Sequence, residues 1–123
     1  MILKFKKDKT GINNDTGKWA EQRAQEYLTE QGLTLVARNF RCRQGEVDLI
    51  MQDSDTLVFV EVRFRKSHHY GTALDTVTQA KQLKVRKAAQ MFLHQQKIGE
   101  ALPMRFDVIG MTEDDIQWVK GAF

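Results

Sequence analysis

Residues 57–65 read LVFVEVRFR, and this run decides the fold. Valine and phenylalanine favour strands because their side chains fit a pleated, half-buried surface. Alternate side chains of a strand lie on opposite faces. One face is then apolar, with Val58, Val60, Val62 and Phe64, and the other carries Phe59, Glu61, Arg63 and Arg65. An isolated buried carboxylate costs several kcal/mol unless a cation or hydrogen bonds meet it, so Glu61 is a candidate for chemistry.

The preceding residues 46–51 read EVDLIM and predict a second strand. Alternation predicts Val47, Leu49 and Met51 on one face and Glu46, Asp48 and Ile50 on the other. Asp53-Ser54-Asp55 is a turn signal, so the two strands are expected to form a hairpin. Asp48 faces Glu61 if paired positions sum to an odd number, which also places 46 opposite 63. That register requires an even-length turn, Ser54–Asp55 or residues 53–56, or a nearby bulge.

Two carboxylates within about 5 Å of each other repel strongly when both are ionised. A divalent cation resolves the repulsion, and Mg²⁺ commonly takes one or two carboxylates together with water and phosphate oxygens. We therefore expect Asp48 and Glu61 to bind Mg²⁺ or Mn²⁺, with Arg63 offering a fixed cation to phosphoryl oxygens. Glu46 is a further candidate metal ligand, although a surface acid, or one that contacts the ligands and not the metal, is slightly favoured. The alternative for the acid pair is a structural salt bridge to Arg63 or Arg43.

The rest of the chain predicts one α/β domain over residues 15–123, with a mixed central β-sheet flanked by helices. Residues 1–14 are rich in lysine and are expected to form a flexible basic arm. Helices are expected over residues 16–31 and 74–96, and Gly32 can end the first in a left-handed conformation. Further strands are expected over residues 33–38, 104–111 and 116–120, with a loop over 41–45.

Composition and charge narrow the classes of function. The formal net charge of +3 and the pI of about 9.1 are compatible with a polyanionic partner. Cys42 is the single cysteine, which excludes an intrachain disulfide and a four-cysteine zinc site. The amino terminus lacks a signal-peptide core and no apolar run reaches the roughly 20 residues that span a bilayer, so a cytoplasmic protein without a membrane partner is expected. The residues expected to contact nucleic acid are Arg41, Arg43, Arg65, Lys66 and Gln79.

Four stretches form a recognisable set: residues 32–39, GEVDLI at 45–50, FVEVRFRKS at 59–67 and RFDV at 105–108. Together they resemble the YraN family of bacterial proteins, which is related to archaeal Holliday-junction resolvases. The resemblance runs from about Gly17 to the carboxyl terminus. It implies the restriction-endonuclease-like (resolvase-like) fold of the PD-(D/E)XK superfamily, a metal-dependent phosphodiesterase scaffold. It also implies that Glu21 joins the catalytic residues, with Asp48, Glu61 and Arg63 matching the core motif.

The chain departs from the family pattern within the core motif. Val47 stands at the motif's proline, a position that supplies no ligand. Arg63 stands at the position where the motif has lysine. Arginine stays protonated and cannot act as a general base, although it can still orient phosphate. Lys81, on the following helix with Gln79, is the candidate for a displaced catalytic lysine.

Three functions remain open. The first is a Mg²⁺- or Mn²⁺-dependent endonuclease acting on DNA, with branched or structured DNA as one substrate class. The second, motivated by Arg63, is a catalytically weak or inactive nucleic-acid-binding module of the same fold. The third is a protein-interaction domain with a structural charge cluster. DNA is favoured over RNA, and because resolvase-like nucleases often act as dimers, a homodimer is one expected form.

Other conspicuous residues receive structural interpretations. Asp107 could be a further acid of the site, but an edge-strand or hydrogen-bonded structural role in its strand is expected. Aromatic residues expected in the core or in an interface, rather than as base-stacking platforms, are Trp19, Trp118 and Phe92. His68 and His69 lack partners at metal-ligand spacing and are expected in a flexible loop near substrate.

Overall fold

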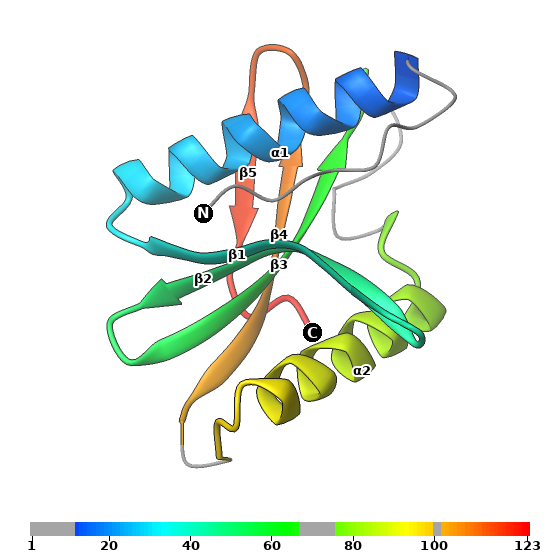
Figure 1. Ribbon diagram of the computed structural model, residues 1–123. Helices are drawn as coiled ribbons and strands as arrows, with labels where there is room; N and C mark the ends of the chain where they lie inside the picture. Colours follow the sequence, from blue (N-terminus) through cyan, green and yellow to red (C-terminus); the bar gives the residue numbers. More distant parts are fainter. Residues whose placement is uncertain (1–11, 67–75, 100–101) are drawn as a thin grey trace.

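The computed structural model describes residues 12–66, 76–99 and 102–123, and in these a five-stranded sheet lies between two helices (Figure 1). The elements are α1 (Ile12–Glu30), β1 (Thr34–Cys42), β2 (Gly45–Asp53), β3 (Thr56–Phe64), α2 (Gln79–Gln95), β4 (Met104–Met111) and β5 (Ile116–Val119). The strand order is β1-β2-β3-β4-β5. β3 and β4 are parallel and the other neighbours antiparallel, which confirms an α/β protein with a mixed sheet.

The first helix and first hairpin differ from their predicted bounds. α1 begins at Ile12, inside the expected basic arm, and Gly32 beyond its end takes the predicted left-handed conformation with φ 102°. The expected loop over residues 41–45 is wrong, because β1 continues to Cys42 and β2 starts at Gly45. The two strands are therefore joined by a two-residue turn.

The second helix starts later than predicted. It begins at Gln79, where Thr78 caps it by accepting a 3.2 Å hydrogen bond from the Lys81 N–H. Residues 76–78 precede the helix, and residues 74 and 75 lie outside the described part of the chain. β4 has its predicted bounds, and β5 ends one residue early at Val119. Within the described residues, no helix has the length and apolarity needed to cross a bilayer.

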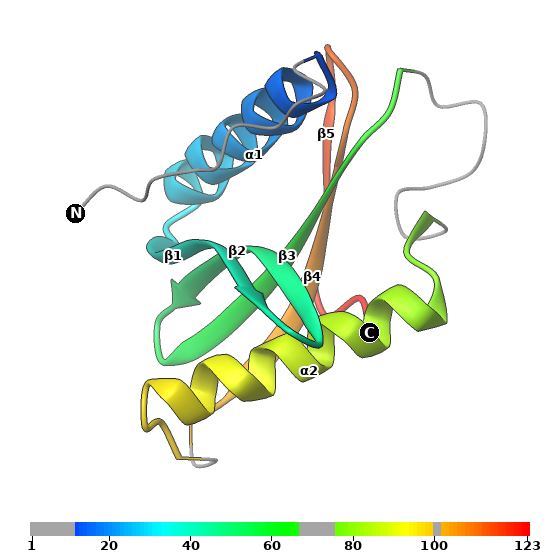
Figure 2. The same cartoon turned by 45° about the vertical axis from the view of Figure 1, so that its right-hand side comes forward.

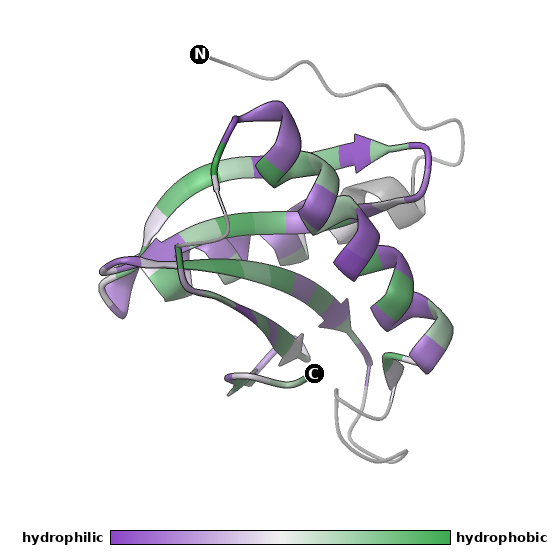
Figure 3. Ribbon diagram, turned by 90° about the horizontal axis from the view of Figure 1, so that it is seen from below, coloured by the Kyte–Doolittle hydropathy of each residue, from purple (hydrophilic) through white to green (hydrophobic). Residues whose placement is uncertain are grey.

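One helix covers each face of the sheet (Figure 2). The core under α1 contains Ala20, Ala24, Leu28, Leu49, Met51, Val58, Val60 and Ile109. The core under α2 contains Val47, Ile50, Leu57, Phe59, Val85, Ala88, Ala89, Phe92 and Phe106. Hydrophobic residues accordingly predominate in the middle of the strands, whereas hydrophobic and hydrophilic residues alternate along the helices (Figure 3). Each fully buried large side chain contributes about 1.5–3 kcal/mol relative to exposure, so the two cores fix the sheet between the helices.

The predicted register of the β2–β3 hairpin is confirmed as far as the strands pair. Partners run from Asp53↔Thr56 to Leu49↔Val60, and each pair sums to an odd number. Ser54 and Asp55 form the predicted two-residue turn, in which Ser54 has φ 56°. The ladder ends at Leu49↔Val60, so neither of the predicted pairings, 48 with 61 and 46 with 63, is part of it.

The predicted faces of β2 are wrong at Val47. Leu49 and Met51 lie under α1 as a pair, but Val47 joins Ile50 in the core under α2. In β1, Asn39 has φ 52° and lies between the pairs Arg38↔Leu49 and Phe40↔Val47, next to Asp48 of β2. Regular alternation is therefore interrupted between Val47 and Leu49, and the side chain of Val47 lies on the opposite face of the sheet.

Candidate metal and nucleic-acid site

Asp48 marks the point where β2 and β3 separate. Their backbone pairing ends at Leu49↔Val60, and the Val62 N–H then donates a 2.8 Å hydrogen bond to Asp48 Oδ2. The carboxylate thus accepts a main-chain hydrogen bond at the opening between the strands. Asp48 is 8% exposed, so its charge interacts strongly with neighbouring groups.

Glu61 meets two cations on the α2 side of the sheet. Its Oε2 lies 3.4 Å from Arg63 Nη1 and 3.6 Å from Lys81 Nζ. Its Oε1 is buried and has no hydrogen-bond partner of adequate geometry in the described residues. While one of the two carboxyls is protonated, the Asp48 side chain can form a hydrogen bond with Glu61. Once both are ionised, this oxygen requires a cation nearby.

The two acids perturb each other's protonation. Burial, and then the charge of Glu61, raise the pKa of Asp48 to about 8, against the lowering effect of the Val62 hydrogen bond. Burial likewise raises the pKa of Glu61, while the charges of Lys81 and Arg63 lower it. At neutral pH the metal-free pair therefore keeps a proton, which a bound cation would displace.

α1 brings a third acid, Glu21, to the same place. Burial, and then the charge of Asp48, raise the pKa of Glu21 to about 7, against a hydrogen bond with Asn39 that lowers it. Glu21 is half-buried on the flank of α1. The structure therefore brings Glu21 together with Asp48, as the family resemblance implied, and its catalytic role stays a prediction.

Glu46 lies at the rim of this group. Its Oε1 is 3.4 Å from Arg41 Nε, across the β1–β2 pair, and both side chains are substantially exposed. Its charge contributes to the raised pKa of Asp48. An exposed ion pair of this kind adds little stability. Arg41 can therefore bind an anion, or Glu46 a cation, with little loss of folding free energy.

The two basic residues beside Glu61 are held from different elements. Arg63 Nε donates to Thr76 Oγ1 at 3.1 Å, and Arg63 Nη2 donates to the Thr76 carbonyl at 3.4 Å. Lys81 projects from the first turn of α2, whose backbone Thr78 caps. Both side chains are about one third exposed, so each can contact a ligand as well as Glu61.

The chemistry of this acid pair fits a hard divalent cation. Asp48 and Glu61 offer carboxylate oxygens, and Glu61 Oε1 is buried without a partner in the described residues. Residues 12–66, 76–99 and 102–123 contain no group of three or more His, Cys, Asp or Glu side chains that could hold a metal ion. Mg²⁺ does not need such a group, because it keeps several waters and takes one or two carboxylates. Asp48 and Glu61 are thus the residues suited to bind Mg²⁺ or Mn²⁺.

A basic depression opens beside the acids, between the β1–β2 turn and α2. It has a volume of about 330 Å³, and its lining includes Arg41, Arg43, Glu46, Lys81 and Lys84. A second hollow of about 370 Å³ adjoins it at Gln44 and is lined by Lys87, Gln90, Met91 and His94. α2 carries no acidic residue to offset its lysines. We call the two hollows together the basic groove.

The remaining residues predicted to bind nucleic acid lie elsewhere. Gln79 is exposed at the start of α2. Arg65 follows β3, where its N–H donates to the Met111 carbonyl at 2.8 Å. Lys66 lines a separate cavity with Trp19. His68 and His69 lie outside the described residues. The structure thus joins Arg41 and Arg43 to Lys81, and separates them from Lys66.

Asp107 has the hydrogen-bonded structural role that was predicted, but not on an edge strand, since β4 lies between β3 and β5. It is fully buried, and its carboxylate accepts hydrogen bonds from Arg105 Nε at 3.0 Å, Trp118 Nε1 at 2.9 Å and the Gly121 N–H at 2.9 Å. These bonds tie β4 to β5 and to the carboxyl-terminal residues. Of the aromatic residues, Phe92 is in the core and Trp118 is half-buried, whereas Trp19 is 45% exposed and is not a core residue.

Sequence reasoning did not identify three groups that shape the site. The Val62 N–H is a backbone group that binds Asp48, and Thr76 accepts a hydrogen bond from Arg63, which is distant in sequence. No local sequence pattern predicts either contact. Gly45 lies against the carbonyl of Lys84, where an added Cβ would clash. A signal for Thr78 was present, since threonine directly before a helical segment is a common N-cap.

Comparison with known proteins gives the family. A model of the family described as "Uncharacterised protein family UPF0102" matches residues 20–111. Proteins named "UPF0102 protein" from Saccharophagus degradans and Alcanivorax borkumensis are 50% and 51% identical to the chain, over 90% and 89% of its length and 94% and 91% of theirs. One from Nitrosococcus oceani is 44% identical over 94% of the chain and 96% of its own length. The family match spans well over half of the chain and these relatives match almost end to end, so the chain belongs to the UPF0102 (YraN) family.

Proposed function

We propose that this protein is a divalent-metal-dependent endonuclease acting on DNA, and that its sheet and helices form the restriction-endonuclease-like (resolvase-like) fold. The observation that carries the proposal is the convergence of Asp48 and Glu61 at the opening between β2 and β3. Both are buried, both have raised pKa values, and Glu61 Oε1 makes no hydrogen bond in the described residues. Perturbed acids beside cations are typical of functional sites, because stability alone does not favour them.

A bound Mg²⁺ or Mn²⁺ would supply charge stabilisation for a scissile phosphate and a water of lowered pKa. The residues of the chain bind and orient. Asp48 and Glu61 offer the ligand oxygens, and the Val62 N–H fixes the direction of the Asp48 carboxylate. Glu21, with a pKa of about 7, can accept or release a proton near neutral pH beside Asp48.

Arg63 and Lys81 together replace the single lysine of the family motif. Arg63 stays protonated and is already bonded to Thr76, so it is suited to orient a phosphoryl oxygen. Lys81 reaches Glu61 from α2, at 3.6 Å, and is therefore close to the acids despite its distance in sequence. The position of Lys81 supports it as the displaced lysine.

The basic groove supports nucleic acid as the partner. Arg41, Arg43, Lys84 and Lys87 lie along the groove that starts at Lys81, so a phosphate backbone in the groove would pass beside the acids. Arginine and lysine neutralise phosphates and release counterions, which is the main source of affinity for DNA.

Cleavage of labelled DNA in Mg²⁺ or Mn²⁺ tests the proposal, with junction, flap and single-stranded substrates compared. Asp48→Asn and Glu61→Gln are expected to lower the rate on the order of 100-fold or more, while Asp55→Asn in the exposed β2–β3 turn is the matched control. Isothermal titration with Mn²⁺ measures metal binding separately. Cleavage that persists in Asp48→Asn would identify a contaminating nuclease and overturn the assignment.

Arg63 favours a second candidate, a DNA-binding module of the same fold without turnover. An arginine cannot take a proton from an attacking water, so activity depends on Lys81 or Glu21 replacing that role. This candidate predicts salt-sensitive DNA binding with no product after prolonged incubation in either metal. Product formation that is lost in both Asp48→Asn and Glu61→Gln excludes it.

A further inference from the structure

A third cavity lies away from the acids, where α1, the end of β3 and the β4–β5 turn meet. It has a volume of about 660 Å³, within the usual range of small-molecule sites, and is lined by Thr16, Trp19, Phe64, Lys66 and Glu113. Trp19 is 45% exposed, which is unusual for a tryptophan in a folded domain of this size. No role in metal binding or in the basic groove accounts for this cavity.

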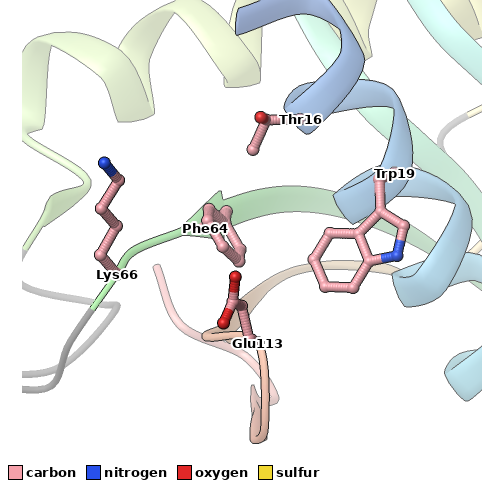
Figure 4. A pocket seen from close by; sticks show the side chains of 5 residues that line it. All are labelled: Thr16, Trp19, Phe64, Lys66 and Glu113. Atoms are coloured by element: carbon pink, nitrogen blue, oxygen red, sulfur yellow. The ribbon is translucent and has the colours of Figure 1, made fainter. Parts of the chain in front are cut away.

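The two aromatic rings form a corner. The Trp19 and Phe64 centroids are 5.5 Å apart and their planes make an angle of 89°. A flat ligand can therefore lie against one ring face while its edge meets the other ring. In Figure 4 Trp19 and Lys66 stand on opposite sides of Phe64, with the Glu113 carboxylate and Thr16 below and above the ring.

Lys66 and Glu113 give the cavity opposite charges on its rim. A ligand that matches it has a flat π surface, an anionic group for Lys66 and hydrogen-bond donors for Glu113. A nucleotide has all three, because adenine, guanine and cytosine carry an exocyclic amino group and the phosphate is anionic. A purely apolar peptide would leave both charged groups without a complementary partner.

We propose that the Trp19–Phe64 cavity is a nucleotide subsite, in which one unpaired base stacks on the aromatic corner with its phosphate at Lys66 and its amino group at Glu113. This inference rests on the proposed function and adds a substrate class, DNA with an unpaired nucleotide. Phe64 is three residues beyond Glu61 on β3, about 10 Å along the strand. Since the two side chains lie on opposite faces, the subsite takes a flanking nucleotide and not the one at the acids.

The test uses the indole N–H signals of Trp19 and Trp118 in nitrogen-15-labelled protein, with EDTA present so that metal plays no part. Trp19→Phe assigns the two signals. Titration with dAMP or dCMP is expected to shift the Trp19 signal and leave Trp118 in place, and dTMP to shift it less. Glu113→Gln is expected to narrow the difference between dCMP and dTMP. No movement of the Trp19 signal at millimolar nucleotide overturns the subsite.

Fluorescence anisotropy with a short labelled single strand gives a second readout. Trp19→Ala is expected to weaken binding roughly 5- to 150-fold, the value of one base stacked on an aromatic ring. Leu83→Ala is the control, because Leu83 is 52% exposed on another surface. Equal affinity of wild type and Trp19→Ala, with no nucleotide-induced shift, removes the subsite and leaves the nuclease proposal standing. Nucleotide-induced shifts without oligonucleotide binding or cleavage support the subsite and remove the DNA function.

Discussion

Gly45 lies against the main-chain carbonyl of Lys84, so closely that a Cβ atom has no room between β2 and α2. Glycine at this position lets the β1–β2 turn contact the helix, as Figures 1 and 2 show. The contact sets the spacing of the basic groove and brings Lys81, one turn before Lys84, to Glu61. The glycine of the GEVD motif is thus a packing requirement that serves the site.

Gly45→Ala is expected to destabilise the protein by about 1–3 kcal/mol, because the obstructing atoms belong to the backbone of a helix and cannot move alone. Urea unfolding followed by circular dichroism measures the change. Gly17→Ala is the matched control, since Gly17 is in α1 and an added Cβ there would meet nothing within 4 Å. Alanine at that position should raise stability by up to about 1 kcal/mol. Equal effects of the two substitutions would contradict the close contact.

The metal-free protein is expected to lose stability as pH rises. The pKa of Asp48 goes from 3.8 to about 8 on folding, so between these values the folded state holds a proton that the unfolded state has released. The contribution is fully present below pH 3.8 and is lost as pH rises to about 8. The raised pKa values of Glu21 and Glu61 act in the same direction.

Melting temperatures at about pH 5, 6.5 and 8 in EDTA measure this dependence. Asp48→Asn should flatten the profile, and Mn²⁺ should restore stability mainly at the highest pH, where binding displaces fewer protons. A wild-type profile as flat as that of the variant would show that Asp48 ionises normally.

Lys81→Gln is expected to lower the cleavage rate at saturating DNA about 100-fold, while DNA binding loses no more than one phosphate contact. Lys81 Nζ lies 3.6 Å from Glu61 Oε2, so its charge acts at the acids. Lys84→Gln is the control, since Lys84 lines the same depression but is one helical turn further along. Single-turnover rates at saturating DNA separate chemistry from binding. Similar losses in both variants would reduce Lys81 to a phosphate contact.

DNA affinity should fall steeply with salt, and substitutions in the basic groove should reduce that slope. Each phosphate contact contributes about 0.9 to the slope of log affinity against log salt concentration on duplex DNA. Arg43→Gln and Lys87→Gln should each lower the slope by about one contact. Lys120→Gln, which removes a cation over the Trp118 ring beyond β5, should leave it unchanged. A slope that none of the three alters would place the DNA on another surface.

Asp107→Ala is expected to cost about 3–5 kcal/mol, because it leaves the buried donors of Arg105, Trp118 and Gly121 without an acceptor. Trp118→Phe removes one donor and should cost less. Urea unfolding gives the loss, and Mn²⁺ titration of the folded variant should match wild type. Weakened metal binding in a variant that is still folded would make Asp107 part of the metal site.

Local pattern was enough to predict the hairpin, and the odd-sum register followed from the condition that Asp48 faces Glu61. Val58 and Val60 alternate with Phe59 and Glu61, and the two-residue turn at Ser54 sets a register that runs to Leu49↔Val60, one position short of Asp48 and Glu61. β4 was predicted with its observed bounds for the same reason, since strand preference and alternation act between near neighbours. Helix starts were less predictable, because the Thr78 cap competes with an apolar pattern that begins earlier.

The sequence by itself determined the strands, the acid-bearing hairpin and the basic character of α2, since each follows from residues within a few positions of one another. Tertiary structure alone decided that Val47 turns to α2, that Glu21 lies beside Asp48, and that Lys81 reaches Glu61. These relationships join residues that are far apart along the chain. They depend on how two helices pack on a twisted, interrupted sheet, which no local period encodes.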